Sequence, residues 1–293
     1  MATRKRRLRE LLSRKEILMV PGAYDALSAR MAESCGFEAV YMTGGGTVCA
    51  QLGMPDHSVI TMTEMVLSAS RIAKAVKLPV ISDADTGYGG VLNVMRAVEE
   101  FESAGVSAIH IEDQVLPKRC GHLGGKEIVS VEEMQGKIRA ACHARKDPDF
   151  VIIARVDAKA VSGYDAAVER GRAYAAAGAD MVFPEALETE EEFRAYAKAV
   201  DAPLMANMTE FGKTPFFSAE AYQEMGYCMV IYPVSALRVA LKAVHELFAE
   251  IKKTGTQKDC LEKMYTRKQL YELVGYHDML ELEKRFAVKS SGI

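Results

Sequence analysis

Eight short apolar runs recur along the chain of 293 residues, and each is followed by turn residues and a segment with helical periodicity. Short apolar runs bounded by turn residues are typical of buried strands. The runs span residues 17–20, 39–42, 78–82, 108–112, 151–154, 181–184, 204–207 and 229–232. The sequence therefore predicts eight β-strands.

Helical segments separate these runs, so strand and helix alternate along most of the chain. The segments span residues 25–35, 62–75, 91–104, 130–145, 165–177, 189–200, 219–225 and 235–252. Several end in Ala-Gly or Cys-Gly, which is a common helix stop. Strands joined by crossover helices pair in parallel, so the pattern predicts an α/β fold, a (β/α)₈ TIM-type barrel.

An open, doubly wound sheet is the alternative arrangement of the same elements. Such a sheet normally has a glycine-rich phosphate-binding turn, G-x-G-x-x-G, after its first strand. The corresponding turn here reads Pro21-Gly22-Ala23-Tyr24-Asp25. This difference favours the barrel.

Length and composition fit a single folded domain. Hydrophobic residues make up 49% of the chain and charged residues 26%, a balance that allows a large buried core. We expect one barrel domain over residues 1–293, with residues 255–293 as a C-terminal helical extension.

The charge distribution excludes several classes of partner. A net charge of −3 without a basic domain gives no reason to expect nucleic-acid binding. The basic run at residues 4–9 is interpreted as a solvated first helix turn rather than a phosphate-binding patch. No run of 18 or more apolar residues predicts a membrane span, and no signal peptide is evident. We therefore expect a cytoplasmic enzyme without nucleic-acid or membrane partners.

Polar residues follow the predicted strands directly. In a TIM-type barrel the chemistry takes place at the C-terminal ends of the strands. A single aspartate there is more often a helix cap than a ligand, but several buried carboxylates at one rim repel each other unless a cation neutralises them. The residues at these ends are Thr43, Asp83, Asp85, Glu112, Asp113, Arg155, Asp157, Glu185 and Asn207 to Glu210.

Three of these carboxylates form a candidate metal site. Asp83 and Asp85 are two residues apart, and Glu112 is expected on the neighbouring strand. Oxygen ligands without a histidine cluster suit magnesium, or manganese, better than zinc. Because magnesium usually takes one or two direct carboxylates, we expect Asp83 or Asp85 to bind directly and Glu112 to act directly or through water.

Two further groups can bind a carboxylate of a substrate. Arg155 can bind one with two parallel hydrogen bonds, and the backbone of Thr43, Gly44 and Gly45 can present N–H donors. A salt bridge from Arg155 to Asp157 or Glu185 is the alternative, and it is compatible with substrate binding.

The segment 116–126 follows the fourth strand and combines Cys120 with cationic neighbours and three glycines. Nearby cations lower the pKa of a thiol, and glycines allow a loop to fold over a ligand. An exposed loop with an incidental cysteine is the alternative interpretation.

Motifs along nearly the whole chain resemble the isocitrate lyase and phosphoenolpyruvate mutase superfamily. They are residues 21–25, 41–46, 83–89, 112–114, 118–122, 154–155, 183–186 and 206–215. The sequence Lys118-Arg119-Cys120-Gly121-His122 is typical of the carbon–carbon lyases and is missing from phosphoenolpyruvate mutase. Residues 207–215, 231–238 and 255–267 resemble the 2-methylisocitrate lyase family within this superfamily.

This resemblance implies magnesium-dependent, retro-aldol cleavage of 2-methylisocitrate, a small hydroxy polycarboxylate, to pyruvate and succinate. It assigns Cys120 as the acid that protonates the carbanion, Tyr41 as a group that helps to take the hydroxyl proton, and His122 as a further catalytic residue. It also implies a homotetramer with exchanged C-terminal helices. The implied substrate-binding residues are Thr43, Gly44, Gly45, Cys120, Gly121, Arg155, Glu185, Asn207, Met208, Thr209, Arg238 and Arg267.

Three departures from the family pattern bear on the substrate. Thr43 replaces a common serine, Val156 replaces a common threonine, and Leu123-Gly124-Gly125 replaces an Arg-Pro pair, as in the loop of isocitrate lyase. The alternatives are a 2,3-dimethylmalate lyase, which forms pyruvate and propionate, and a catalytically silent barrel used for binding or assembly. A Schiff-base aldolase needs a lysine at an inner strand end, and none of the eight runs ends in one.

Overall fold

The computed structural model describes residues 3–119, 121 and 124–287. The chain divides into two compact units, residues 1–237 and 238–293, and each is described by itself. Two predicted catalytic residues, Cys120 and His122, lie outside the described residues.

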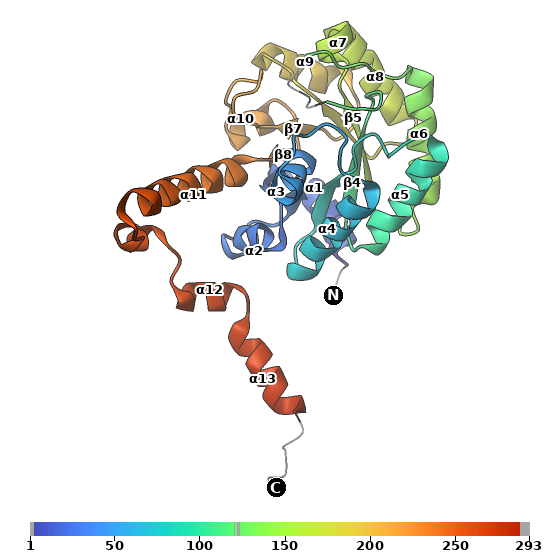
Figure 1. Ribbon diagram of the computed structural model, residues 1–293. Helices are drawn as coiled ribbons and strands as arrows, with labels where there is room; N and C mark the ends of the chain where they lie inside the picture. Colours follow the sequence, from blue (N-terminus) through green and yellow to red (C-terminus); the bar gives the residue numbers. More distant parts are fainter. Residues whose placement is uncertain (1–2, 120, 122–123, 288–293) are drawn as a thin grey trace. The chain divides into compact units, whose positions relative to one another are not determined.

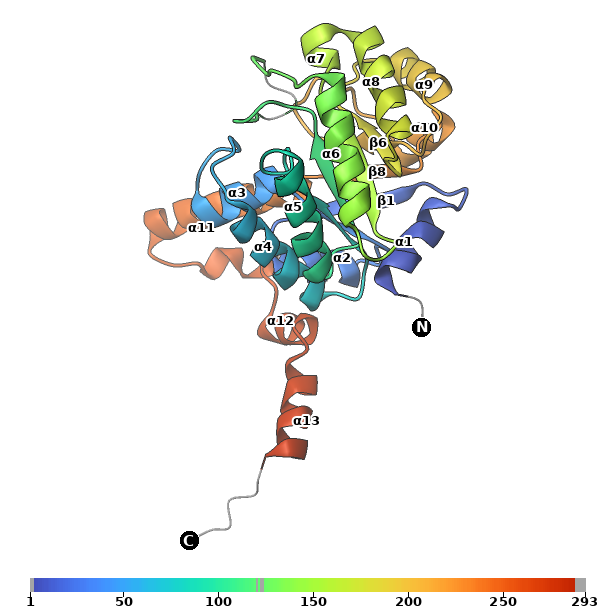
Figure 2. The ribbon, with the colours of Figure 1, turned by 90° about the vertical axis from the view of Figure 1, so that its right-hand side faces the viewer.

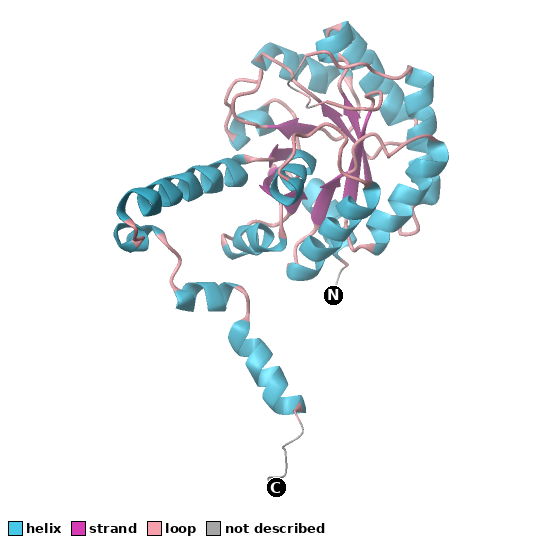
Figure 3. Cartoon of the chain, in the orientation of Figure 1, coloured by secondary structure: helices cyan, strands magenta, loops and turns pink. Residues whose placement is uncertain are grey.

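The first unit is a barrel of eight parallel strands surrounded by helices (Figures 1 and 3), so the predicted fold class is confirmed. Neighbouring strands follow the order β6-β5-β4-β3-β2-β1-β8-β7, and a bridge between Val182 and Leu204 joins the two ends. The strands are β1 (Leu18–Ala23), β2 (Val40–Met42), β3 (Val80–Asp83), β4 (Ala108–Glu112), β5 (Val151–Val156), β6 (Met181–Pro184), β7 (Met205–Asn207) and β8 (Met229–Tyr232).

The predicted helices are confirmed to within a few residues at each end. Side-chain caps fix many of their starts; Thr61 and Ser130, for example, accept hydrogen bonds from Glu64 N and Glu133 N. The helices of this unit are α1 (Arg4–Leu12), α2 (Ala26–Ser34), α3 (Gly44–Leu52), α4 (Met62–Ala75), α5 (Val91–Ser103), α6 (Val131–Ala144), α7 (Lys159–Ser162), α8 (Tyr164–Ala176), α9 (Glu190–Ala199) and α10 (Ala219–Glu224).

Helix α3 was not predicted, because three consecutive glycines disfavour a helix. It forms because Thr43 caps it, accepting a hydrogen bond from Gly46 N at 3.2 Å. Packing also requires a glycine at position 44, since a Cβ atom there would lie 2.3 Å from Asp83 Oδ2. The glycines thus bring the start of α3 against the end of β3.

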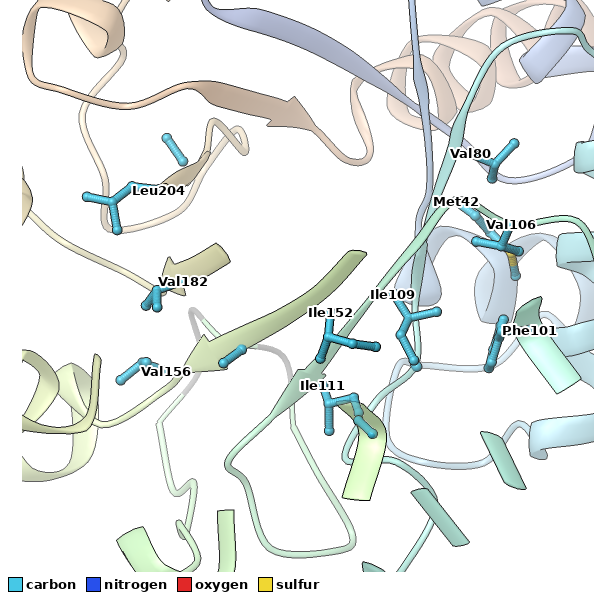
Figure 4. Packing of buried hydrophobic residues seen from close by; sticks show 14 of the residues in the cluster. Met42, Val80, Phe101, Val106, Ile109, Ile111, Ile152, Val156, Val182 and Leu204 are labelled. Atoms are coloured by element: carbon cyan, nitrogen blue, oxygen red, sulfur yellow. The ribbon is translucent and has the colours of Figure 1, made fainter. Parts of the chain in front are cut away.

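Side chains alternate along each strand between the barrel interior and the surrounding helices. On β4, Ala108 packs in the inner core cluster, whereas Ile109 and Ile111 pack in the outer one. Figure 4 shows members of this outer layer, including Ile111 and Ile152 from neighbouring strands. The alternation leaves His110 and Glu112 on the inner face of the barrel.

Helix α1 closes the end of the barrel at which the strands begin. Leu8 and Leu11 are buried in the inner core cluster. Arg9 Nη2 donates to the carbonyl oxygens of Pro148 and Phe150 at 2.9 and 3.2 Å. Figure 2 shows α1 and α3 on opposite sides of the barrel. The expected helix turn is present but only partly solvated: Arg6 and Arg7 are exposed, whereas Leu8 is a core residue and Arg9 binds the barrel.

The second unit contains most of α11 (Ser235–Thr254), followed by η1 (Lys258–Lys263), α12 (Arg267–Leu273) and α13 (Tyr276–Phe286). These match the helical segments expected after residue 235. Within this unit many large apolar side chains are exposed, among them Leu241, Phe248, Met279 and Phe286. Among the described residues, no helix has the length and apolarity needed to cross a membrane.

Candidate active site

Several of the predicted site residues of the barrel follow inner-face positions at the ends of the strands. Tyr41 and Phe183 belong to the inner core cluster. Because side chains alternate along a strand, Thr43 and Glu185, two residues further along, follow on the same side. The same two-residue step places Asp83 after Ile81, Arg155 after Ile153 and Asn207 after Met205.

The adjacent strand ends bring the backbones of Asp83, Asp85 and Glu112 next to one another. Glu112 N donates to Asp85 O at 2.9 Å, and Asp85 N donates to Asp83 Oδ1 at 2.9 Å. Asp85 has a positive φ of 46°, a conformation uncommon outside glycine that aspartate tolerates better than most residues. Asp83 and Asp85 are each 4% exposed and Glu112 is fully buried.

Lys118 supplies positive charge to these carboxylates. Its Nζ atom lies 2.9 Å from Asp85 Oδ1 and 2.6 Å from Asp56 Oδ1, and the residue is 2% exposed. Burial alone lowers the pKa of the ammonium, but the carboxylates, led by Asp85 and Glu112, raise that pKa well above its ordinary value. Lys118 therefore remains charged and neutralises part of the rim.

Glu112 is a buried carboxylate that lacks hydrogen-bond donors among the described residues. Arg155 Nη1 lies 3.1 Å from Glu112 Oε2 as an ion pair, yet neither carboxylate oxygen has a hydrogen-bond partner in the described part of the chain. Burial raises the pKa of Glu112 well above its ordinary value, although Arg155 and Lys118 lower it. Buried acceptors without donors are costly, so this site can accept a ligand or an ordered water.

Asp85 is a second rim carboxylate whose pKa is raised. Burial, together with the neighbouring carboxylates, raises its pKa to about 6 against the effect of Lys118. In contrast, the pKa of Asp83 is lowered overall, because its surrounding cations and the Asp85 N–H outweigh the effect of burial. The two aspartates thus differ although they are two residues apart.

Arg155 forms the salt bridges considered as the alternative to substrate binding. Its Nε and Nη2 atoms donate to the two carboxylate oxygens of Asp157 at 2.9 and 3.1 Å. Glu185 Oε2 lies 3.6 Å from Nε. A guanidinium group has five N–H donors, so these contacts fix Arg155 without using all of them. The salt bridges of Arg155 are therefore compatible with binding of a substrate carboxylate.

Tyr41 pairs with His110 inside the barrel. Tyr41 Oη lies 2.7 Å from His110 Nε2, and the two rings stack with an interplanar angle of 16°. Burial lowers the pKa of His110 to about 4, so the imidazole is neutral near pH 7. Burial also raises the pKa of Tyr41 well above its ordinary value, so its resting form is the neutral hydroxyl.

The loop after β4 reaches the same site through Gly121. A Cβ atom at Gly121 would lie 2.4 Å from Arg155 Nη2 and 2.6 Å from Glu185 Cγ, so only glycine fits there. Lys126 Nζ donates to Gly121 O at 2.5 Å. The described part of the 118–122 signature is therefore adjacent to Arg155 and Glu185.

The remaining predicted binding residues divide into three groups. Asn207 Nδ2 lies 3.3 Å from both Glu185 carboxylate oxygens, and Thr209 is 8% exposed. The Met208 side chain packs instead in the outer core, where Phe217 N and Tyr222 Oη contact its sulfur. Arg238 and Arg267 belong to the second unit and remain predictions as site residues.

The carboxylates are compatible with a hard divalent cation. Within residues 3–119, 121 and 124–287, no three histidine, cysteine, aspartate or glutamate side chains are grouped closely enough to hold a metal ion by themselves. The all-oxygen set of Asp83, Asp85 and Glu112 nevertheless suits magnesium, and the two unpartnered Glu112 oxygens can accept from metal-bound water.

Sequence reasoning missed several residues of this site. His110 could have been found from its position two residues before Glu112, which places both on the inner face. Lys118 and Lys126 were treated only as charged neighbours of Cys120, and Asp56 lies outside every predicted strand end. No local pattern brings Asp56 to Lys118, because 62 residues separate them and only the fold joins them.

Comparison with known proteins agrees with this geometry. The family model described as phosphoenolpyruvate phosphomutase matches residues 8–252. A 2-methylisocitrate lyase of Aeropyrum pernix is 51% identical over 280 residues, covering 96% of this chain and 89% of that protein. A 2,3-dimethylmalate lyase of Eubacterium barkeri is 46% identical over 281 residues, covering 96% and 97%.

Solved structures show the same fold. A crystal structure of 2,3-dimethylmalate lyase, a PEP mutase/isocitrate lyase superfamily member, matches with a TM-score of 0.92 and 39% identity, covering 100% of this chain and 99% of that one. Phosphonopyruvate hydrolase in complex with oxalate and Mg²⁺ matches with a TM-score of 0.88 and 34% identity, covering 97% and 99%. The chain belongs to the phosphoenolpyruvate mutase/isocitrate lyase superfamily and is an enzyme of its lyase type.

Proposed function

We propose that this lyase cleaves 2-methylisocitrate to pyruvate and succinate. The observation that carries the proposal is the buried rim itself, in which Asp83, Asp85 and Glu112 lie beside the cations Arg155 and Lys118. Among the described residues, the Glu112 oxygens have no hydrogen-bond donor. A substrate with a hydroxyl group and several carboxylates matches this combination of candidate metal ligands and cations. The relatives named 2-methylisocitrate lyase support the choice of acid.

Magnesium is the proposed cofactor, with manganese as the alternative. Asp83 or Asp85 would bind it directly, and Glu112 would act directly or through water. When bound, such an ion favours ionisation of the 2-hydroxyl group and withdraws electrons from the carboxylate beside it. The magnesium complex of phosphonopyruvate hydrolase supports this assignment.

The residues of the chain have separate tasks in the proposed retro-aldol step. Arg155 and the backbone of Gly44 and Gly45 orient carboxylates. Tyr41 takes the hydroxyl proton as it passes its own phenolic proton to His110 Nε2, which lies 2.7 Å from Tyr41 Oη. The carbon–carbon bond then breaks, the hydroxyl carbon becomes the carbonyl of pyruvate, and the electron pair remains on the succinate fragment. Cys120 donates the proton that completes succinate. His122 is proposed as a further catalytic residue of the same signature.

Gly121, Glu185, Asn207 and Thr209 are proposed to complete the binding site within the barrel. Arg238 and Arg267 of the second unit are proposed to contact the additional carboxylate of a tricarboxylate. The Met208 N–H donates to Ile231 O at 2.9 Å, and the Met208 side chain is occupied in the outer core.

A cytoplasmic homotetramer with exchanged C-terminal helices is also proposed. Leu237, Leu241, Val244, Phe248 and Ile251 repeat on α11 at alternating spacings of four and three residues, a seam typical of helix–helix association. Leu241, Val244, Phe248 and Ile251 are exposed in the single chain. A chain truncated near Gly255 should lose the tetramer in light scattering; an unchanged tetramer would contradict exchange of residues 255–293.

2,3-Dimethylmalate is the second candidate substrate, because relatives named for that activity match over nearly the full chain. It carries a methyl group where 2-methylisocitrate carries a carboxymethyl arm. The test is kcat/KM for product release from 2-methylisocitrate, 2,3-dimethylmalate, oxaloacetate and isocitrate by the full chain. We expect 2-methylisocitrate to give the highest value. A higher value for 2,3-dimethylmalate would replace the proposed substrate, and no turnover of any acid would overturn the lyase proposal.

A further inference from the structure

Lys126 is a buried cation in the loop after β4, and its ammonium group makes two contacts inside the protein. Its side chain is 1% exposed, and its ammonium donates to Gly121 O at 2.5 Å and to Asp157 Oδ1 at 2.7 Å. A lysine is rarely buried unless it is paired, because removing an ammonium from water is costly. The two acceptors come from different parts of the chain, the loop after β4 and the end of β5.

Asp157 is shared between Lys126 and Arg155. The same carboxylate accepts from Arg155 Nε and Nη2 at 2.9 and 3.1 Å. Its backbone N–H donates to Asp113 Oδ1 at 2.8 Å, and Asp113 is held in turn by Tyr174 Oη at 2.8 Å. Asp157 is therefore a fixed point that orients a candidate substrate-binding arginine and anchors the loop at the same time.

Gly121 packs directly against that arginine. The missing Cβ at Gly121 would lie 2.4 Å from Arg155 Nη2, closer than any real contact allows. The Gly121 backbone therefore packs closely against the side chains of Arg155 and Glu185. Lys126 donates to the carbonyl oxygen of the same residue.

Other contacts of the described residues fix neighbouring parts of the loop. Val115 N donates to Glu127 O and Val129 N donates to Asp113 O, each at 2.9 Å. The Gln114 side chain binds both the N–H and the carbonyl of Arg119 at 2.9 Å, and Lys118 binds Asp85. The contacts of Lys126 join Gly121 to the end of β5.

We propose that Lys126 is a positioning residue, which ties the loop backbone at Gly121 to Arg155 through the shared Asp157 carboxylate. The inference rests on the proposed lyase function, in which Cys120, the neighbour of Gly121 in sequence, donates a proton to a substrate held by Arg155. Its role is to set the distance between the loop and the arginine, and it does not react itself.

The test compares Lys126→Met with a matched control, Lys5→Met, in the full chain. Lys5 is also largely buried, at 19% side-chain exposure, and pairs with Glu102 and Asp147 at 2.9 and 3.3 Å, at the end of the barrel closed by α1. We expect Lys126→Met to lower kcat/KM by about 100-fold, mainly through kcat, because small misplacements of reacting groups are that costly. Lys5→Met should leave kcat/KM within about twofold, because its ion pairs lie at the opposite end of the barrel from the rim.

A second readout does not depend on turnover. Amide hydrogen exchange in residues 115–128 should become roughly tenfold faster in Lys126→Met, while exchange in the barrel strands stays unchanged. Lys126→Arg keeps the charge beside Asp157 and should show smaller changes in the same direction, so it provides the test if Lys126→Met fails to fold.

Unchanged kcat together with unchanged exchange in residues 115–128 would overturn the role of Lys126. Faster exchange throughout the barrel would do so too, since it would show a general contribution to stability. Failure of the proposed function is a separate result: the wild-type chain would then turn over none of the four acids.

Discussion

The two ends of the barrel use the same ion-pair chemistry but differ in burial. At the end closed by α1, Lys5 binds Glu102 at 2.9 Å and Arg9 binds Asp180 at 3.0 Å, with these cations 19% and 30% exposed. At the opposite rim, Lys118 and Arg155 are 2% and 8% exposed. Water can screen the first set, whereas the second set determines the charge of a dry site.

Two buried carboxylates, one at each end, also differ in their hydrogen bonds. Glu102 accepts hydrogen bonds from Lys5 Nζ and from the backbone of Lys146 and Asp147. Glu112 at the rim is buried without a hydrogen-bond partner among the described residues. Of these two carboxylates, Glu102 has its acceptors filled by the barrel, whereas Glu112 retains acceptors that a ligand can use.

Cys120→Ser gives the largest expected effect. Turnover should fall by about 10²–10⁴-fold, the range typical for loss of a general acid, because serine is a much weaker proton donor. Substrate binding, measured by calorimetry, should be retained within a few-fold. A variant with full turnover would contradict the proton-donor role, and a silent barrel would show no turnover to lose.

Leu8→Ala tests the base of the barrel. Leu8 is fully buried in the inner core cluster, so its truncation should lower the free energy of unfolding by about 2–5 kcal/mol. The kcat of the folded variant should match that of the wild type, because α1 lies at the other end from the rim. A large fall in kcat at unchanged stability would contradict the division between the two ends.

Arg155→Lys and Arg9→Lys form a matched pair across the two ends. A lysine cannot reproduce the two parallel bonds to Asp157, so Arg155→Lys should lower kcat/KM by roughly 100-fold. Arg9→Lys removes comparable contacts at the base and should leave kcat/KM within about twofold. Equal effects of the two variants on kcat/KM would contradict the functional difference between the two ends of the barrel.

The smallest expected effect is a pH dependence at Glu102. Burial raises its pKa, but hydrogen bonds from the Lys146 backbone and from Lys5 outweigh burial, and the net pKa is lowered from the ordinary value of 4.5. A lowered carboxylate pKa contributes stability above the unfolded pKa and loses it as pH falls through the folded one. Wild type should therefore exceed Glu102→Gln in urea unfolding at neutral pH, and the gap should shrink below about pH 4.5. A gap independent of pH would contradict this assignment.

The sequence predicts the barrel well because short apolar runs, helical periodicity and helix stops are local signals. All eight strands appear within a few residues of their expected positions, and the backbones of Asp83, Asp85 and Glu112 meet because neighbouring strand ends must meet. Helix α3 was not predicted, because glycine is a poor helix former and Gly44 serves close packing against Asp83.

Other features depend on contacts that no local pattern contains. Leu8 and Leu11 become core residues only when α1 docks on the finished barrel. Asp56 and Lys118 are joined by the fold, as are Lys126 and Asp157. The Met208 side chain faces the outer core, because consecutive side chains at the end of β7 point to opposite faces and Asn207 takes the inner one. This alternation can be seen in the sequence, and it could have excluded the Met208 side chain as a substrate ligand.

The most direct test of the central claim is product release from 2-methylisocitrate by the full chain, with the metal concentration varied. The account predicts equimolar pyruvate and succinate, release that stops when a chelator removes divalent cations, and recovery when magnesium is restored. Release of neither product at saturating magnesium, or equal release in the presence of the chelator, would contradict it.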